Sequence, residues 1–389
     1  MSIESQNTAK ESSDSVSNDN AIIVELVTEQ QFAELREDWN KLLQTSSASS
    51  VFLTWEWAYS WWQNFGKQEQ LCLAVARKNN LIVGIGPFAI RHIMIAGLVP
   101  VRRLVFLGAT GASGEYLDII CDPVLEKDVT NAIFGFLASS VRWDETELTD
   151  LLPSSALFSY ADEIQATLGL DLEKTNAQIC PYIDLSPSLE DVIGGIKPRL
   201  WKNVRYCTRR LEREFDVTIQ YVTEVGELQE AMDDFFTLHS SRWAERGNLG
   251  GFQQDKKRSF YRQVAQLTLK QEWLRLYRLQ VDGHCVATLF GFQYRNVFFY
   301  LQAGFNPEWK KYSVGQVLIG RILRDLVTDG VDRFDFLRGP EDYKYDWGAS
   351  DRATHTLRLR QRGFKGFVSQ QMESGTNAMR SLLRRVKNR

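Results

Sequence analysis

The sequence predicts a mixed α/β protein made of two similar domains in tandem, and two internal repeats predict it. The first repeat opens each half: VELVTEQQFAELREDW begins at Val24, and IQYVTEVGELQEAMDDF begins at Ile219. Each segment is a short β-like run, then Val-Thr-Glu, then a helix with apolar spacing. Thr28 and Thr223 stand where a helix favours an N-cap residue followed by an acidic residue in its first turn.

The second repeat is a pair of hairpins at the centre of each half. LCLAVARKNNLIVGIGPFAI starts at Leu71, and LRLYRLQVDGHCVATLFGFQ starts at Leu274. Asn79-Asn80 and Asp282-Gly283 are typical of tight turns between antiparallel strands. Because the repeats keep their order and have similar offsets, we expect duplicated domains, each with an N-terminal strand and helices before an antiparallel meander. A repeat this long and mixed does not fit a solenoid.

Length sets the domain organisation. At about 100–200 residues per domain, a chain of 389 residues predicts two domains. We expect a disordered polar tail over residues 1–20, which lacks the apolar segment of a signal peptide. The N-terminal domain is expected at residues 21–185 and the C-terminal domain at residues 186–370, with a junction between Pro181 and Pro187. Residues 371–389 form a basic tail.

Composition narrows the class of protein. A net charge of −3 with 44% hydrophobic residues is typical of a globular chain and argues against bulk nucleic-acid binding. The five cysteines are scattered, which fits reduced thiols in the cytoplasm, and the four histidines lack metal-ligand spacing, so we expect no metal site. Pro87, Arg91 and Pro100 interrupt the apolar residues 81–101. This stretch therefore predicts two short strands and a turn, and no transmembrane segment.

The segment NPEWKKYSVGQVLIGRILRDLV, from Asn306 to Val327, is a candidate anion site. It turns from a β-like run into an apolar-striped helix, and a helix N-terminus exposes backbone amides that attract anions. Small residues at Ser313 and Gly315 would let an anion approach, and two preceding lysines would add charge. The alternative is an ordinary strand-to-helix turn. The first half has no comparable lysine turn, so we assign the chemistry to the second half.

Two further segments have open interpretations. KPRLWKNVRYCTRRLEREF, residues 197–215, predicts a basic helix, which binds the phosphates of a substrate or of tRNA, or is a plain solvated face. TWEWAYSWWQ, residues 54–63, places aromatic side chains on one helix face. Packing in the core or between the halves is the first interpretation of that face, and a sugar-stacking platform is the second.

These segments resemble a known superfamily. The strand, NPEWKKYSVGQVLIG and the helix are similar to the acyl-CoA site of the GCN5-related N-acetyltransferases (GNAT), whose motif is R/Q-x-x-G-x-G/A. Lys310 falls on the Arg/Gln position, Ser313 on the first Gly and Gly315 on the second, so the first two depart from the motif. Together with VFLTWEWAYSWWQNFG and FDFLRGPEDYKYDWG, the chain from Ile22 to Phe367 resembles BioF2-like, CelD-type acetyltransferases. Its tandem halves also resemble Fem-type aminoacyl transferases.

The resemblance implies two tandem GNAT-like domains and acyl-CoA, acetyl-CoA first, as cosubstrate. It implies a donor site in the second domain, at Ala303, Gly304, Phe305, Lys310, Lys311, Tyr312, Ser313, Val314, Gly315 and Gln316. In the comparison with Fem-type transferases, YKYDWG sits where those enzymes carry a Phe-Lys pair near the reaction centre, so the resemblance implies Tyr343 and Lys344 in those places.

The residues near that strand end leave several roles open. Asp335 alternates with phenylalanines and could act as a general base if burial raises its pKa; the alternative is a structural Asp–Arg pair. Lys344 could pair with a substrate phosphate or with the developing oxyanion; the alternative is a solvated lysine. Arg338 near the strand end and Arg205, Arg209 and Arg210 on the basic helix are the candidate substrate-binding residues.

We therefore expect a cytoplasmic acyl-CoA-dependent N- or O-acyltransferase. Its acceptor would be a sugar or an intermediate of the cell envelope or of exopolysaccharide biosynthesis, the setting in which CelD-like proteins occur. Expected partners are that small-molecule or glycan-precursor acceptor and polysaccharide-synthesis proteins. One alternative is Fem-like transfer from aminoacyl-tRNA, the only reading that involves nucleic acid. Another is a non-catalytic scaffold in a polysaccharide-synthesis complex.

Overall fold

The structure is a computed structural model that describes residues 21–95, 97–112, 114–185, 188–245, 251–363, 366 and 371. The tails expected at residues 1–20 and 371–389 lie outside the described residues, residue 371 apart.

The two halves share a series of elements: a strand, helices, a three-stranded meander, a helix, a short strand, a helix and a last strand. The elements of the first half are β1 (Ile23–Leu26), α1 (Glu29–Glu34), α2 (Arg36–Thr45), η1 (Val51–Leu53), α3 (Trp55–Phe65), η2 (Gly66–Gln68), β2 (Glu69–Lys78), β3 (Leu81–Ile95), β4 (Val99–Phe106), β5 (Ile120–Cys121), α4 (Glu126–Ser140), β6 (Glu145–Thr146), β7 (Leu148–Leu151), α5 (Ala156–Leu168) and β8 (Asp171–Asp184). The elements of the second half are α6 (Leu189–Gly195), α7 (Pro198–Glu214), β9 (Val217–Tyr221), α8 (Val225–Glu245), α9 (Asp255–Leu269), β10 (Leu274–Val281), β11 (His284–Tyr294), β12 (Val297–Phe305), η3 (Pro307–Tyr312), α10 (Val314–Thr328), β13 (Arg333–Asp335), α11 (Asp342–Asp346) and β14 (Ser350–Arg360).

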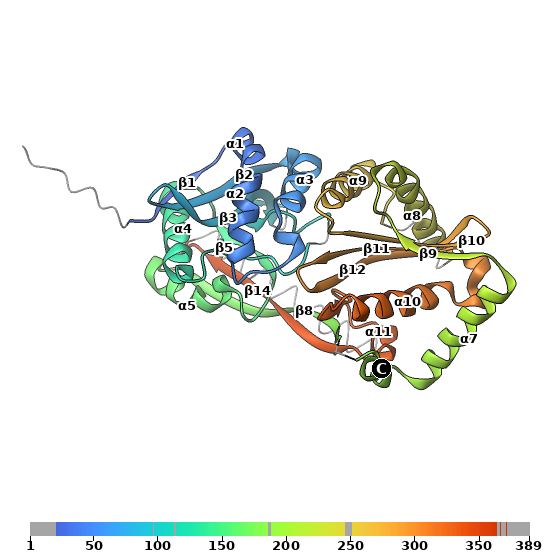
Figure 1. Ribbon diagram of the computed structural model, residues 1–389. Helices are drawn as coiled ribbons and strands as arrows, with labels where there is room; N and C mark the ends of the chain where they lie inside the picture. The colour runs from blue at the N-terminus through green and yellow to red at the C-terminus, as the bar shows by residue number, and fades with distance from the viewer. Residues whose placement is uncertain are drawn as a thin grey trace, which may run out of the picture.

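The strands form one continuous mixed sheet in which the two halves are arranged symmetrically about its centre. The order is β1-β2-β3-β4-β6-β14-β8-β13-β12-β11-β10-β9, so each half contributes an antiparallel meander at one end of the sheet. In each half a helix then leads to a parallel strand: β4 pairs with β6 and β12 pairs with β13 in parallel. Figure 1 shows the two halves side by side. The prediction of tandem mixed α/β halves is confirmed.

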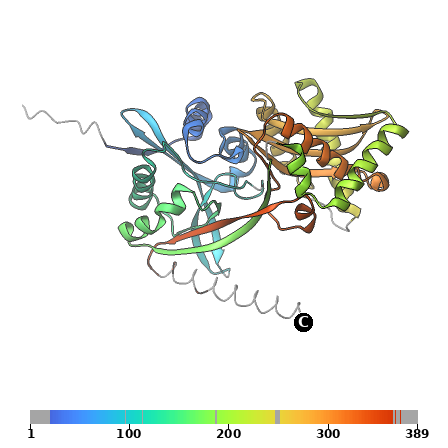
Figure 2. The same cartoon turned by 60° about the horizontal axis from the view of Figure 1, so that its bottom comes forward.

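The last strand of each half joins the sheet of the other half. Strand β8 pairs with β13 of the second half, and β14 returns to pair with β6 and β7 of the first. The two exchanged strands also pair with each other along most of their lengths, and Figure 2 shows them running together between the halves. Pro181, expected in a junction between domains, therefore lies inside β8.

The predicted hairpin turns are confirmed by their backbone. Asn79 and Asn80 have φ of 51° and 62°, and Asp282 and Gly283 have φ of 49° and 78°, the left-handed conformation that such two-residue turns require. The prediction of two strands and a turn within residues 81–101 is confirmed, since β4 begins at Val99, but the first strand is not short: β3 continues for 15 residues through Pro87. Pro87 lies between the residues of β3 that pair with β5 and those that pair with β4, so no ladder bond needs its missing N–H.

The aromatic helix α3 packs between the halves, as its first interpretation predicted. Trp57 is 1% exposed, and its ring lies 5.0 Å from that of Phe260 in α9 and 6.2 Å from that of Phe292 in β11. Phe52 contacts Phe299 of β12 in the same way, with 5.7 Å between ring centroids. One hydrophobic core therefore runs from the first half under α8 and α9, and a second core lies between the opposite face of the second half and α7 and α10.

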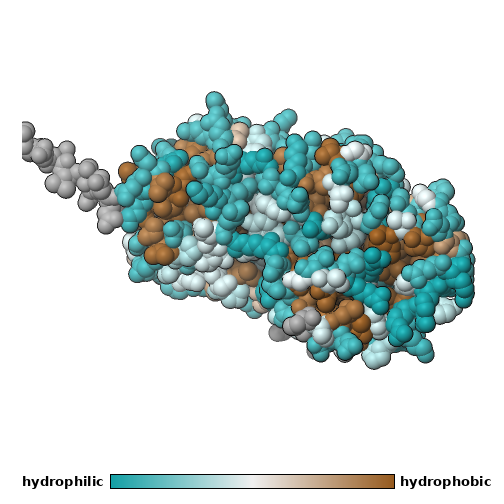
Figure 3. Space-filling view, in the orientation of Figure 1, coloured by the Kyte–Doolittle hydropathy of each residue, from teal (hydrophilic) through white to brown (hydrophobic). Residues whose placement is uncertain are grey.

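Hydrophilic side chains cover most of the face in Figure 3, and the hydrophobic ones lie in separate patches. Within the described residues, no helix combines the length and the apolar composition needed to cross a bilayer.

Candidate functional site

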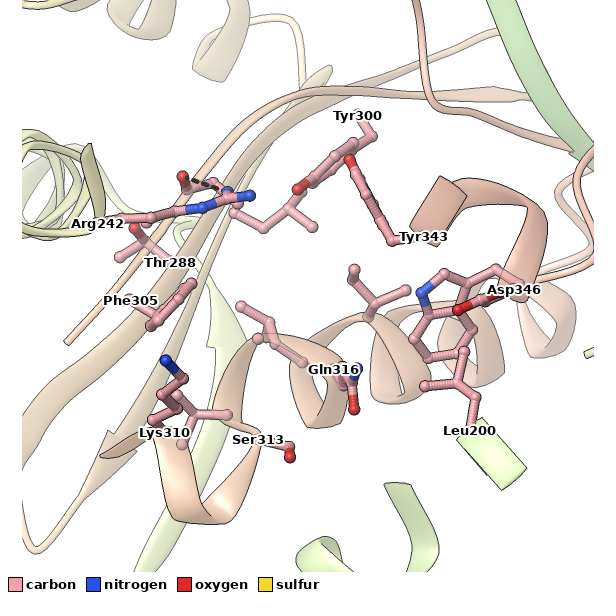
Figure 4. A pocket seen from close by; sticks show the side chains of 18 residues that line it. Leu200, Arg242, Thr288, Tyr300, Phe305, Lys310, Ser313, Gln316, Tyr343 and Asp346 are labelled. Carbon is pink, nitrogen blue, oxygen red and sulfur yellow. Dashed lines mark hydrogen bonds between the residues drawn. The ribbon is translucent and has the colours of Figure 1, made fainter. Parts of the chain in front are cut away.

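The candidate site is an opening in the sheet of the second half. Strands β12 and β13 pair only at Val297–Phe299 with Arg333–Asp335, so the rest of β12 has an open edge on that side. A β-bulge precedes the opening: Phe290 faces Gln302 and Gly291 faces Tyr300, which leaves Leu301 without a cross-strand partner on β11. A pocket with a volume of about 310 Å³ lies at this edge (Figure 4). Its lining comprises Leu200, Arg242, Thr288, Leu289, Tyr300, Ala303, Gly304, Phe305, Lys310, Ser313, Val314, Gly315, Gln316, Leu318, Ile319, Tyr343, Asp346 and Trp347.

The pocket brings together most of the predicted donor site. Eight of the ten expected residues line it, and the two that do not are Lys311 and Tyr312. The side chain of Tyr312 is buried on the other side of the turn, where its hydroxyl donates to Glu214 of α7 at 2.8 Å. In Figure 4 the amino group of Lys310 points into the cavity, whereas the hydroxyl of Ser313 points away from it.

The start of α10 presents two backbone amides to the pocket. Ser313 has φ 48° and ψ 41°, a left-handed conformation that ends η3 and begins α10. The amide of Ser313 donates to the carbonyl of Lys310, and the amide of Gln316 donates to the carbonyl of Ser313. Neither amide is available to an anion, although both residues belong to the donor site expected from the sequence. Among the described residues, the amides of Val314 and Gly315 have no partner. The anion site predicted from the sequence is therefore reduced to these two donors and the partial positive charge of the helix end.

Gly315 and Gly304 differ in how much space surrounds the position of a Cβ atom. A Cβ on Gly315 would lie 3.7 Å from Cδ1 of Phe305, an ordinary contact, so nothing beside it excludes a methyl group. A Cβ on Gly304 would lie 2.3 Å from the backbone nitrogen of His239 in α8. Gly304 thus lets helix α8 pack directly on β12, a role that the sequence did not indicate.

Helix α8 also supplies the cation nearest the open strand edge. Nη1 of Arg242 donates to the carbonyl of Ala303 at 3.2 Å, and its guanidinium lies 5.6 Å from the ring centroid of Phe305. Nε of Arg242 is buried and has no hydrogen-bond partner. The hydroxyl of Thr288, on β11 opposite Gly304, is also buried without a partner. Neither residue was predicted, because neither lies near the turn motif in the sequence.

Tyr343 is the predicted catalytic residue that lines the pocket. It lies on the short helix α11, and Figure 4 shows its hydroxyl directed toward Tyr300 of β12. Burial and the neighbouring Tyr300 hydroxyl raise the pKa of Tyr343 well above its ordinary value. The phenol is therefore protonated at neutral pH, where it can donate a hydrogen bond but cannot act as a base.

Asp335 does not line the pocket. Its carboxylate is fully buried, accepts from the hydroxyl of Tyr116 at 3.0 Å and from the amide of Leu337 at 2.8 Å, and forms an ion pair with Arg352 of β14. Burial raises the pKa of Asp335, and the charge of Arg352 opposes that shift. The geometry favours the structural Asp–Arg pair that the sequence left open, with Arg352 as the arginine.

Lys344 is buried and does not line the pocket either; it holds a loop together. Only 2% of the residue is exposed, and Nζ donates to the carbonyls of Leu337, Arg338 and Gly339 at 2.8–3.1 Å. Nζ also lies 2.9 Å from a carboxylate oxygen of Glu341. The solvated lysine considered as the alternative is therefore wrong, because these contacts use the donors of the ammonium.

Arg338 belongs to a buried charge network between the halves. Its Nε donates to Oε1 of Glu115 at 2.7 Å, its backbone amide donates to Oε2 at 2.9 Å, and Nη2 lies 3.4 Å from Asp150. Burial raises the pKa of Glu115 to about 7, and Arg338 opposes the shift. Because Arg338 is engaged by the first half, its predicted contact with substrate has no support in the geometry.

The predicted arginines of the basic helix α7 do not reach the pocket. Arg205 and Arg209 line a separate groove between α7 and α10. Arg210 pairs with Glu214, at 3.1 Å between Nε and Oε1, and its guanidinium stacks 4.5 Å from the ring centroid of Tyr312. Helix α7 contributes Leu200 to the pocket, and Asn203 ties it to the turn by donating to Ser313 Oγ and Gln316 Oε1.

The corresponding place in the first half is unsuited to an anion. Helix α4 occupies the position of α10, since it connects β4 to its parallel neighbour β6. Glu126 and Asp128 lie in its first turn, whereas the first turn of α10 has no acidic residue. Carboxylates at a helix N-terminus compete with a bound anion for the same positive end. Within the described residues, no group of histidines, cysteines and carboxylates in either half could hold a metal ion.

Comparisons with known proteins find similarities in sequence family and in fold. Residues 199–345 match the family model of the acetyltransferase (GNAT) domain, a range that includes β12, the turn and α10. No curated protein matches the chain. Among solved structures, FemX is 9% identical with a TM-score of 0.59, and the match covers 86% of this chain and 96% of that one.

Two further solved structures have a similar fold. The C-terminal domain of a putative lysylphosphatidylglycerol synthetase from Agrobacterium fabrum is 13% identical with a TM-score of 0.53, covering 90% of this chain and 96% of its own. L-PGS from Bacillus licheniformis is 12% identical with a TM-score of 0.50, covering 87% and 96%. At these identities the likeness shows the fold alone. The chain therefore has the GNAT-like α/β fold, and residues 199–345 match the model of the GNAT acetyltransferase domain.

Proposed function

We propose that this protein transfers an acyl group from acyl-CoA, with acetyl-CoA as the first donor to test, to an amine or hydroxyl of an acceptor. The observation that carries the proposal is the open edge of β12 beside the two unpartnered amides of Val314 and Gly315, inside a GNAT-type domain. A diphosphate accepts hydrogen bonds from such amides and is favoured by the helix dipole. Lys310 adds a positive charge to the same pocket.

The pocket also fits the rest of a CoA donor. Leu318 and Ile319 of α10, Trp347 and Leu200 give its lining an apolar stretch, and an extended pantetheine arm can bury its methylene groups against such side chains. The open edge of β12 leaves backbone groups available to the amides of that arm. The thioester would then lie toward Tyr300 and Tyr343.

The reaction we propose is direct attack on the thioester. The acceptor's nitrogen or oxygen forms a bond to the acyl carbon and gives up its proton, the carbon–sulfur bond breaks, and the leaving thiolate takes up a proton, so that the products are the acylated acceptor and the CoA thiol. Tyr343 lines the same pocket, and its protonated hydroxyl can donate a hydrogen bond to the leaving sulfur. The lining also contains a carboxylate, Asp346, which forms an ion pair with Lys197 of the basic segment. Asp335 and Lys344 take positioning roles in this proposal.

The acceptor class rests on the resemblance to CelD-type proteins. We propose a sugar or a cell-envelope or exopolysaccharide intermediate. Titration calorimetry with CoA and acetyl-CoA tests the donor, and thiol release with a panel of amino sugars tests the acceptor. Absence of CoA binding at millimolar ligand would contradict the proposal and favour a non-catalytic scaffold.

A second candidate is transfer from aminoacyl-tRNA, favoured by the groove between α7 and α10. Arg205, Arg209 and Arg324 line that groove, and the guanidinium of Arg324 lies 5.7 Å from the ring centroid of Trp201. Cations interleaved with an aromatic ring suit a phosphate backbone with stacked bases. If this candidate holds, ribonuclease abolishes activity and replacing both Arg205 and Arg209 by Gln weakens tRNA binding. Activity with purified acetyl-CoA that survives ribonuclease would exclude it.

A further inference from the structure

We propose that the α8 side of the pocket is a subsite for an anionic oxygen group, a carboxylate or a phosphate, carried by the acceptor and held by Arg242 and Thr288. The assignment of this anionic group to the acceptor rests on the proposed function. The anion subsite itself follows from the two side chains.

Arg242 is a cation with unused donors at the wall of a pocket. A guanidinium has five N–H donors, and the contact between Nη1 and the carbonyl of Ala303 accounts for one of them. In the described part of the chain, Arg242 forms no ion pair with a carboxylate, and its Nε is buried without a partner. A partly buried guanidinium that lacks both a counter-charge and a full set of acceptors is costly unless a ligand supplies them.

Thr288 gives an independent observation in the same pocket. The residue is fully buried and lines the cavity, and its hydroxyl has no hydrogen-bond partner. Buried polar side-chain atoms nearly always have a partner, and an exception calls for a ligand or a strained site. Thr288 lies on β11 and Arg242 on α8, so two separate elements leave unsatisfied donors in one cavity. Figure 4 shows the two side chains at the same end of it.

The position of these residues points to the acceptor rather than to the donor. Helix α10, which would hold the diphosphate, packs on one face of the sheet, and α8 packs on the other (Figure 1). Arg242 reaches the pocket from the α8 face and touches the open strand edge at Ala303. A donor on the α10 side therefore leaves this end for the second substrate. Negative charge held here would bring an acceptor to the edge of β12 with its amine or hydroxyl toward the thioester.

The test uses small anions in place of the unidentified acceptor. Inorganic phosphate and acetate are titrated separately into full-length protein saturated with CoA, with calorimetric detection, so that the two arms distinguish a phosphate-binding from a carboxylate-binding subsite. We expect at least one anion to bind with a millimolar Kd and Arg242→Gln to weaken it at least tenfold. Arg77→Gln on β2 removes the same charge from the other half and should leave Kd within twofold of wild type. No binding to wild type, or equal binding to Arg242→Gln, would overturn the subsite.

Thr288→Val separates ligand binding from folding. It removes the hydroxyl at nearly constant volume, so the proposal expects weaker anion binding, by about threefold to tenfold, with a Tm that is unchanged or raised. Unchanged anion affinity in this variant would remove Thr288 from the subsite. If Arg242→Gln weakened CoA itself tenfold, Arg242 would belong to the donor site and the assignment to the acceptor would be wrong.

The same titration without CoA keeps this inference distinct from the proposed function. In free protein, Gly315→Asp blocks the amides of α10, and phosphate or acetate can then bind only elsewhere. One possible result is that wild type does not bind CoA, that an anion still binds to Gly315→Asp, and that adding Arg242→Gln to that variant abolishes anion binding. The acyl-CoA proposal then fails and the anion subsite stands. If CoA binds and neither anion does, the reverse holds.

Discussion

Replacing Gly315 by Asp should abolish CoA binding without unfolding the protein. The Asp side chain would start from a Cβ that has only an ordinary contact, 3.7 Å from Phe305, and would put a carboxylate beside the unpartnered amides of Val314 and Gly315. A carboxylate near a helix N-terminus stabilises the helix by about 0.3–1 kcal/mol. The folded state is therefore expected to tolerate the change, and its free energy of unfolding should not fall.

The expected loss of affinity can be worked from charge. A carboxylate about 5 Å from a phosphate costs about 3 kcal/mol at an effective dielectric constant of about 20. Each amide bond to a charged oxygen that is lost adds about 1.5–3 kcal/mol. At about 1.4 kcal/mol per tenfold change, Kd for CoA should rise at least about a hundredfold. Gly315→Ala is the matched control and should bind within about threefold of wild type. Calorimetry that gives Gly315→Asp the affinity of Gly315→Ala would refute the placement of the diphosphate.

Four further outcomes are expected. Tyr343→Phe should keep CoA affinity and lower kcat by about tenfold, because it removes a hydrogen bond to the charged leaving sulfur, worth about 1.5–3 kcal/mol; an unchanged kcat in steady-state thiol release would exclude that role. Because burial raises the pKa of Glu115 from 4.5 to about 7, the folded state keeps a proton that the unfolded chain loses in this window. Stability therefore falls as pH rises from 4.5 to 7, and the free energy of unfolding of wild type minus that of Glu115→Gln should drop by up to about 3 kcal/mol across it. A flat or rising difference in urea titrations would contradict the burial argument. Lys344→Met should cost about 3 kcal/mol by leaving three loop carbonyls unpaired, and a urea midpoint near that of wild type would show that the loop does not need them. Ser313→Gly should exceed Ser313→Ala in stability by about 1 kcal/mol, because φ is 48° and both variants lose the bond from Asn203; equal Tm values would mean that the turn relaxes.

The sequence predicted the architecture well where local signals repeat. The paired turns Asn79-Asn80 and Asp282-Gly283 fix two hairpins, and each hairpin lies in the middle of one half. The exchange of β8 and β14 could not be predicted, because pairing between strands far apart in sequence depends on packing in three dimensions. Pro181 looked like a boundary for the same reason, although the structure places it inside a strand.

The site was predictable in the part that one segment encodes. The turn from β12 through η3 to α10 carries its own signals, and eight of the ten expected donor residues meet in one pocket. Arg242 and Thr288 were missed because they reach the pocket from α8 and β11, and Tyr300 of β12 was missed because it belongs to no motif. Lys344 was predicted as catalytic from the family resemblance and Asp335 from its alternation with phenylalanines, but burial and hydrogen bonds decide their roles, and these appear only in the folded chain.

A crystal structure of the protein with CoA would show directly where the diphosphate binds. We expect its oxygens within hydrogen-bond distance of the backbone nitrogens of Val314 and Gly315, with the pantetheine arm along the open edge of β12. A CoA molecule bound with its diphosphate away from both nitrogens would contradict this expectation.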